Sequence, residues 1–186
     1  MVTNIQIISF IFLVISTFFF AYYIPYNIES KIRDTQKLLS RNVHIFELLF
    51  HDYREFQRHD VSGIIVRNSI DILTLSYALT AVEDINISIE SRTKEMLTAI
   101  RSALICLSPN LGRTDTIVKK WSELDYKELQ KEKGVWLGKW GLKLQKNISE
   151  KQAFLDTITQ HEKEKNRCSA LAIIFQVVGL LLSVFS

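Results

Sequence analysis

The residues of this chain with the clearest potential for chemistry are the glycines, tryptophans and lysines around position 138. The segment from Gly134 to Trp140 reads GVWLGKW, so two glycines precede a lysine as they do in phosphate-binding loops. Such a loop needs one more residue between its glycines, and a Ser or Thr after the lysine to hold magnesium. Here Trp140 follows Lys139, and no strand precedes the segment. We therefore exclude nucleotide-phosphate binding of this type.

Two other interpretations of the same segment remain open. If it is helical, its glycines share one face and its tryptophans another. Three glycines cost a helix about 3 kcal/mol relative to alanine, so a helix here needs close packing in return. We favour a flexible bend in which the indole side chains cover the core. The alternative is a partner interface or ligand-stacking patch made of Trp136, Lys139, Trp140 and Lys143.

The histidines and cysteines form no recognisable catalytic or metal site. His44, His51 and His59 lie within one arc of a predicted helix, at axial separations of about 10 and 12 Å, which is too far for one metal. Cys106 lies in an apolar helix without a nearby group to activate its thiol. We predict no metal, no cofactor and no enzymatic activity.

The most specific signal is a stripe of small and polar residues near the C-terminus. Its members alternate in spacing between three and four, and they are Ser169, Ala172, Gln176, Gly179 and Ser183. Small residues at this spacing let membrane helices approach closely, and a glutamine at mid-membrane depth can hydrogen-bond across the contact. Two hypotheses stay open. The stripe packs against Ser9, Ser16 and Thr17 of the same chain, or it joins several copies, with Gln176 and Ser183 lining a narrow pore.

The stripe lies in one of two uncharged apolar segments, residues 5–24 and 168–186. At about 1.5 Å per residue, each helix would span roughly the hydrocarbon thickness of a bilayer. The first segment has no basic residue before it, is longer than a signal-peptide core and has no small-residue cleavage site after it. We therefore predict two transmembrane helices, the first a retained anchor. Pro25 marks a kink after it or the start of the next helix.

Orientation follows from the basic residues on the inner flanks of both segments, namely Lys31, Arg33, Lys37, Arg41, Lys163, Lys165 and Arg167. The positive-inside rule places residues 25–167 in the cytoplasm and residues 1–4 outside the cell membrane. Cys106 and Cys168 do not resemble a disulfide framework, which agrees with a reducing compartment. The net charge of +3 is too small and dispersed to indicate direct, specific nucleic-acid binding.

The region between the two segments is predicted to be helical. Only 2 Pro and 6 Gly occur in the chain, which favours long helices. An apolar series at helical spacing, from Ile28 to Phe56, predicts a long first helix over residues 27–59. After a turn at Asp60–Gly63, an apolar helix is predicted at 64–82. The alternating residues 84–90 are interpreted as a helix distortion or a loop.

A helix at 91–107 should end at 108–112, the strongest break in the chain. The following Lys/Glu-rich helix is expected to begin at Thr114 or Thr116, and a last helix to run into the second apolar segment. The predicted fold class is therefore all-α, with N- and C-terminal transmembrane helices and a central antiparallel helical bundle.

This layout resembles the small two-transmembrane effectors of bacterial anti-phage systems, including those encoded beside retrons. The features that carry the resemblance are the segment Ile5–Ile24, the helical middle and the segment Cys168–Ser186. It implies a protein of the bacterial inner membrane that a cytoplasmic protein or ribonucleoprotein holds inactive, and that permeabilises the membrane when released. We therefore predict an oligomeric membrane effector. The alternative is a membrane-anchored helical binding or scaffold protein without pore activity.

Overall fold

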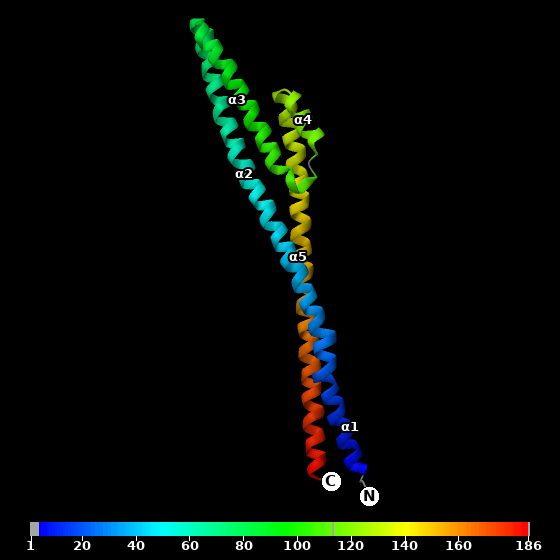
Figure 1. Cartoon of the computed structure of the whole chain (residues 1–186). Coiled ribbons are helices and arrows are strands. Elements are labelled where there is room, and N and C mark those ends of the chain that lie inside the picture. The colour runs from blue at the N-terminus through cyan, green and yellow to red at the C-terminus, as the bar shows by residue number, and fades with distance from the viewer. Residues whose placement is uncertain (1–3, 113, 186) are drawn as a thin grey trace. The chain divides into compact units, whose positions relative to one another are not determined.

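The computed structural model describes residues 4–112 and 114–185, and every regular element within them is a helix (Figure 1). In chain order these are α1 (Asn4–Phe18), the π-helical η1 (Phe19–Glu29), α2 (Ser30–Thr80), α3 (Glu83–Leu107), the 3-10 helix η2 (Pro109–Leu111), α4 (Asp115–Glu123) and α5 (Tyr126–Val184). The predicted all-α fold is thus confirmed. Residues 1–3 of the predicted external segment and Ser186 of the second apolar segment lie outside the described residues.

The chain divides into two compact units. The first, which we call the terminal unit, comprises Met1–Val43 and Ile148–Ser186, and the second, the central unit, comprises His44–Asn147. Each unit therefore takes one part of α2 and one part of α5.

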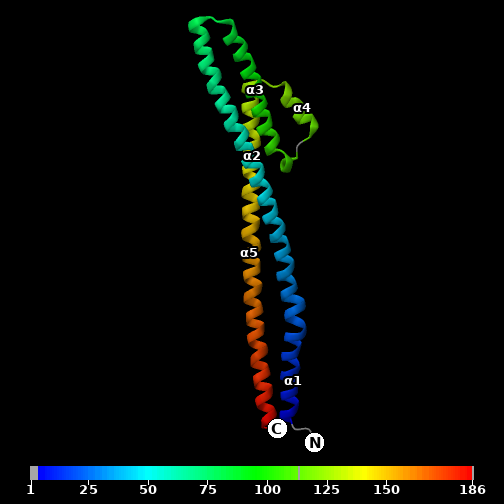
Figure 2. The ribbon, with the colours of Figure 1, turned by 60° about the vertical axis from the view of Figure 1, so that its left-hand side comes forward.

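In the terminal unit, α1 and the C-terminal part of α5 lie side by side in both views (Figures 1 and 2). Two helices are long and apolar enough to cross a membrane, the continuous helical stretch Asn4–Thr80 and α5. Their most apolar windows are only 17% and 11% buried. A helix in the core of a soluble protein would be mostly buried, whereas these two apolar windows are mostly exposed.

Pro25 lies inside η1, where the backbone is wound as a π-helix from Phe19 to Glu29. A proline has no N–H to donate, and in an α-helix its ring clashes with the carbonyl four residues earlier. The wider π winding changes the hydrogen-bond register at this point. The chain thus continues as a helix from α1 into α2 instead of breaking at the proline.

In the central unit, α2 and α3 form an antiparallel hairpin closed by Ala81 and Val82, with Ala81 in a left-handed conformation at φ 48° (Figure 2). The first part of α5 runs antiparallel to α2, because Lys133 contacts Asp60 whereas Trp140 contacts Leu49. The core of this unit is formed by Phe56, Val66, Met96, Ile100, Ala103, Leu104, Leu107, Trp121, Leu129 and Trp136.

Two predicted breaks are wrong. Residues 60–63 are helical within α2. Gly63 is buried, and a Cβ built on it would lie 3.5 Å from the Ala99 side chain, so the small glycine lets α2 and α3 pack closely. Residues 84–90 form the first turns of α3, after a break at Ala81–Val82. Ile85 and Ile89 are half-buried and one helical turn apart, whereas Ile87 is exposed. The alternation therefore reflects partial exposure on a helix and not a strand or loop.

The break predicted at 108–112 is confirmed. Pro109 begins the 3-10 helix, and Gly112 adopts φ 79°, a left-handed conformation that glycine accepts without steric cost. Thr114 is the N-cap of α4, and its hydroxyl oxygen accepts from the Ile117 N–H at 3.4 Å.

Candidate functional site

The candidate site in the terminal unit is the contact between α1 and the C-terminal part of α5. At its centre the Ser9 hydroxyl donates to the Gly179 carbonyl at 2.7 Å, and both residues are buried. A Cβ added to Gly179 would lie 3.0 Å from Leu13 Cγ and 3.2 Å from the Ser9 carbonyl oxygen. Glycine at this position therefore allows the two backbones their close approach, as small residues do between membrane helices.

Another small member of the stripe, Ala172, is buried in the same unit. Phe12 and Phe175 pack with ring centroids 5.6 Å apart. Ser16, one of the three partner residues expected from the sequence, is buried as well. The structure thus brings Gly179 and Ser9 into one intramolecular contact, with Ala172 and Ser16 buried in the same unit.

Gln176 lies at the edge of this contact. Its side chain is exposed and borders a groove of about 300 Å³ whose other lining residues are Leu13, Ser16, Thr17, Phe20 and Ala21. Its amide makes no hydrogen bond with any residue in the described part of the chain. By contrast, Thr17 donates to the Leu13 carbonyl at 2.8 Å and Ser183 to the Leu180 carbonyl at 2.7 Å. Ser169 is half-buried. Gln176 is therefore an exposed polar member of the stripe whose side chain has no hydrogen bond in the described part of the chain.

An ion pair between Glu29 and Lys165 joins the two helices where the apolar segments end. The hydrogen bond from Lys165, followed by the charge of Lys165 and more weakly that of Arg33, lowers the pKa of the Glu29 carboxyl from its ordinary value near 4.5, against an opposing effect of desolvation. Farther along, Asn42 donates to Glu150 at 3.4 Å. Beyond the apolar segments, the same two stretches of helix are thus joined by polar contacts.

The predicted tryptophan–lysine patch is partly in the core of the central unit: Trp136 is buried, Trp140 packs against the core and Lys139 is exposed. Trp136 is only 3% exposed and packs edge-to-face on Trp121 with centroids 5.4 Å apart, while Lys139 lies 4.3 Å from the Trp136 ring centroid. Trp140 stacks on Tyr53 at 4.4 Å and donates its indole N–H to the Leu49 carbonyl at 3.0 Å. Lys143 is half-buried. Both indoles are therefore packed on aromatic rings of the same unit.

The segment that carries these tryptophans is helical, so the predicted bend is wrong. It lies within α5, and no heavy atom lies within 4 Å of a Cβ built at Gly134, Gly138 or Gly141. The close packing expected of a helical form is absent around these three glycines. The buried tryptophans on the other face of the helix provide the packing that holds it.

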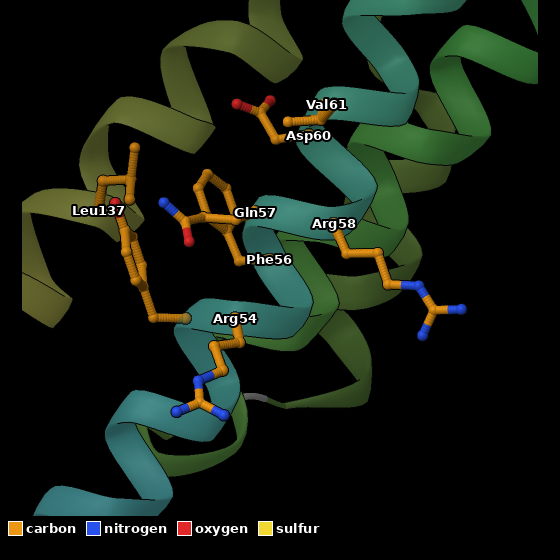
Figure 3. A pocket seen from close by; sticks show the side chains of 8 residues that line it. Arg54, Phe56, Gln57, Arg58, Asp60, Val61 and Leu137 are labelled. Atoms are coloured by element: carbon orange, nitrogen blue, oxygen red, sulfur yellow. The ribbon is translucent and has the colours of Figure 1, made fainter.

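One hollow of the central unit has a volume of about 770 Å³ and is lined by Tyr53, Arg54, Phe56, Gln57, Arg58, Asp60, Val61 and Leu137 (Figure 3). Its arginines point away from Leu137, and Arg58 pairs with Glu55 at 3.7 Å. The Asp60 carboxylate accepts from Lys133 at 2.8 Å. Its charged groups thus do not converge on a common point, as those of a ligand site would.

Metal and thiol chemistry find no support in the described residues. No group of three His, Cys, Asp or Glu side chains among them is arranged to hold a metal ion. Burial, together with the charges of Glu55 and Asp52, raises the pKa of the Cys106 thiol above its ordinary value. A thiol with a raised pKa is a poor nucleophile at neutral pH.

No protein-family model, no curated protein and no solved structure matches this chain. Its function is therefore argued from the contact between α1 and α5.

Proposed function

We propose that this chain is a membrane effector of bacteria. In this proposal the two apolar helices span the inner membrane, residues 25–167 form a helical bundle in the cytoplasm, and copies assemble through the face of the terminal unit that carries Gln176. Assembly permeabilises the bilayer. The observation that carries the proposal is the exposed, unbonded amide of Gln176 within an uncharged, mostly apolar segment.

The energetic argument rests on the cost of an amide in hydrocarbon. Transfer of an amide from water to an apolar medium without a hydrogen bond costs roughly 2–7 kcal/mol. A second copy could supply the missing partner, and one such bond between membrane helices contributes about 0.6–2 kcal/mol. Because Gly179 and Ser9 already hold α1 against α5, the two helices would assemble as a preformed pair. Several pairs arranged around Gln176 would enclose a weakly polar path.

The rest of the proposal concerns control. The basic residues beside both apolar segments favour a cytoplasmic central unit, which would then be accessible to a protein or ribonucleoprotein that restrains assembly. Release of that restraint during phage infection would depolarise the infected cell. An anti-phage role fits the layout of two helices that are long and apolar enough to cross a membrane.

The test is the membrane potential of bacteria induced to express the chain alone, followed with a potential-sensitive dye. We expect rapid depolarisation with the natural chain and at least a tenfold slower response with Gln176→Leu. Val177→Leu is the matched control, because Val177 is an exposed apolar neighbour on the same helix. Equal amounts of each variant in the membrane fraction are required. Full depolarisation by Gln176→Leu, or none by the natural chain, would contradict the proposal.

The second candidate is a membrane-anchored binding or scaffold protein without pore activity. It is favoured by the exposed apolar side chains of the central unit, among which Ile72 is 67% and Leu79 is 79% exposed. Under this alternative the two apolar helices are passive anchors and expression leaves the membrane potential unchanged.

A further inference from the structure

An exposed apolar row runs along the last turns of α2, in the central unit. Its members alternate in spacing between four and three residues and are Val61, Ile65, Asn68, Ile72, Leu75 and Leu79. The apolar members are 54% to 79% exposed. On the other side of the helix, Gly63 and Val66 are buried. The α2–α3 hairpin thus leaves a helix face with a seven-residue repeat uncovered, the pattern of a coiled-coil seam.

We propose that this row is the dimer interface for a second copy of this chain, with the two α2 helices parallel and in register. The position of Asn68 selects this partner and this arrangement. It is the polar member of the row, and parallel pairing in register places it opposite its own copy, where the two amides can hydrogen-bond to each other. An antiparallel or shifted pairing would place the amide against an isoleucine or leucine. A single asparagine at a seam position is a known means of fixing register and orientation.

The flanks of the row also permit close approach of a second helix. Serines occur every seven residues beside it, at Ser62, Ser69 and Ser76. Ser69 donates to the Ile65 carbonyl and Ser76 to the Ile72 carbonyl, each at 3.1 Å, so these small side chains satisfy their hydroxyl groups within their own helix. Between Val61 and Val82 only Arg67 and Asp71 are charged, and Arg67 hydrogen-bonds to Tyr126. Two copies would therefore meet little like-charge repulsion.

The available area is sufficient for a weak, specific dimer. The five apolar side chains are more than half exposed. At roughly 100 Å² each they offer on the order of 500 Å² per copy and about 1,000 Å² for the pair, near the lower limit of specific interfaces. Anchoring in one bilayer would add an effective-concentration advantage. This interface lies on α2 of the central unit and is independent of Gln176 in the terminal unit.

The test is disulfide trapping in membranes containing the full-length chain, with Cys106→Ser and Cys168→Ser removing the natural thiols. Asn68→Cys or Ile72→Cys adds one thiol on the row, and Thr74→Cys adds a matched control at an exposed position on another face of α2. After mild oxidation we expect at least tenfold more dimer from the thiols at 68 and 72 than from the thiol at 74. Trapping should persist with Gln176→Leu, which separates this inference from the proposed pore.

A second variant tests whether the disulfides arise from a specific interface or from random encounters between chains in the membrane. Ile72→Glu with Leu75→Glu places charges on exposed positions of the row, so helix content by circular dichroism should be retained while trapping at position 68 falls at least tenfold. Equal trapping at 68 and 74, no trapping at 68 in folded protein, or a crosslinked product of any mass other than twice that of the chain would overturn the proposal.

Discussion

At the residue scale, Gly179 and Gln176 belong to one stripe but face different surroundings. The Gly179 carbonyl accepts the Ser9 hydroxyl inside the contact with α1, whereas the Gln176 side chain is exposed. A substitution at Gly179 should therefore act on the stability of the helix pair within one copy. A substitution at Gln176 should act on association between copies and leave the pair intact.

We predict that Gly179→Leu destabilises the terminal unit by about 1–3 kcal/mol, the usual cost of forcing extra volume into a packed contact. The new side chain would meet Leu13, which lies 3.0 Å from the position of its Cβ. Thermal unfolding of the detergent-solubilised chain, followed by circular dichroism, should show a lower Tm, with Gly179→Ala intermediate and the exposed Val177→Leu unchanged. An unchanged Tm for Gly179→Leu would show that this contact is not closely packed in solution.

The stripe was predictable from the sequence. Which of its members are buried against α1 and which are exposed was not. Spacing places side chains on one face of a helix, yet the rotation of that face toward a partner depends on the partner's position. Ser9 and Gly179 are 170 residues apart, and no local pattern links them. For Trp136 and Trp140, the residue types and their spacing were compatible both with a core position and with a binding surface. The contacts with Trp121 and Tyr53, which show packing inside the unit, come only from the structure.

At the element scale, α5 is a helix across glycines that favoured a bend. No heavy atom lies near a Cβ built at Gly138, so nothing in the described structure requires glycine there. The helix is maintained by the residues around it and by the buried indoles on its other face. Glycine disfavours a helix, but packing against neighbouring residues keeps this segment helical. Gly63 in α2 is likewise helical, and it is buried against α3. The break at 108–112 was predictable because proline and left-handed Gly112 impose it through the backbone itself.

We predict that Gly138→Ala stabilises the central unit by about 0.5–1 kcal/mol, because alanine loses less backbone entropy in a helix and meets open space. Gly112→Ala is the opposing control, since φ 79° is unfavourable for any residue with a Cβ. Its substitution should cost about 1 kcal/mol even though it also meets open space. Chemical denaturation of the full chain in detergent measures both effects. A lower stability for Gly138→Ala would mean that a helix or loop packs on the glycine face in solution.

At the scale of the whole molecule, the proposed pore and the proposed dimer use surfaces on different units. The terminal unit holds the helix pair and the exposed Gln176 amide, and the central unit holds the α2 row with Asn68. The proposed pore and the proposed dimer should therefore respond independently to substitution. This separation also distinguishes an effector from a scaffold, because only an effector needs the particular side chains of its apolar segments.

Exchange of both apolar segments provides the corresponding test. Replacing residues 5–24 and 168–185 with unrelated alanine–leucine helices of equal length removes Ser9, Gly179 and Gln176 while keeping a hydrophobic length suited to the bilayer. We expect the exchanged chain to remain in the membrane fraction and to retain disulfide trapping from Asn68→Cys, but to lose depolarisation entirely. Membrane potential and trapping are measured in the same cells, with the natural chain as reference. Depolarisation equal to that of the natural chain would show that the apolar segments act only as anchors, and would favour the scaffold.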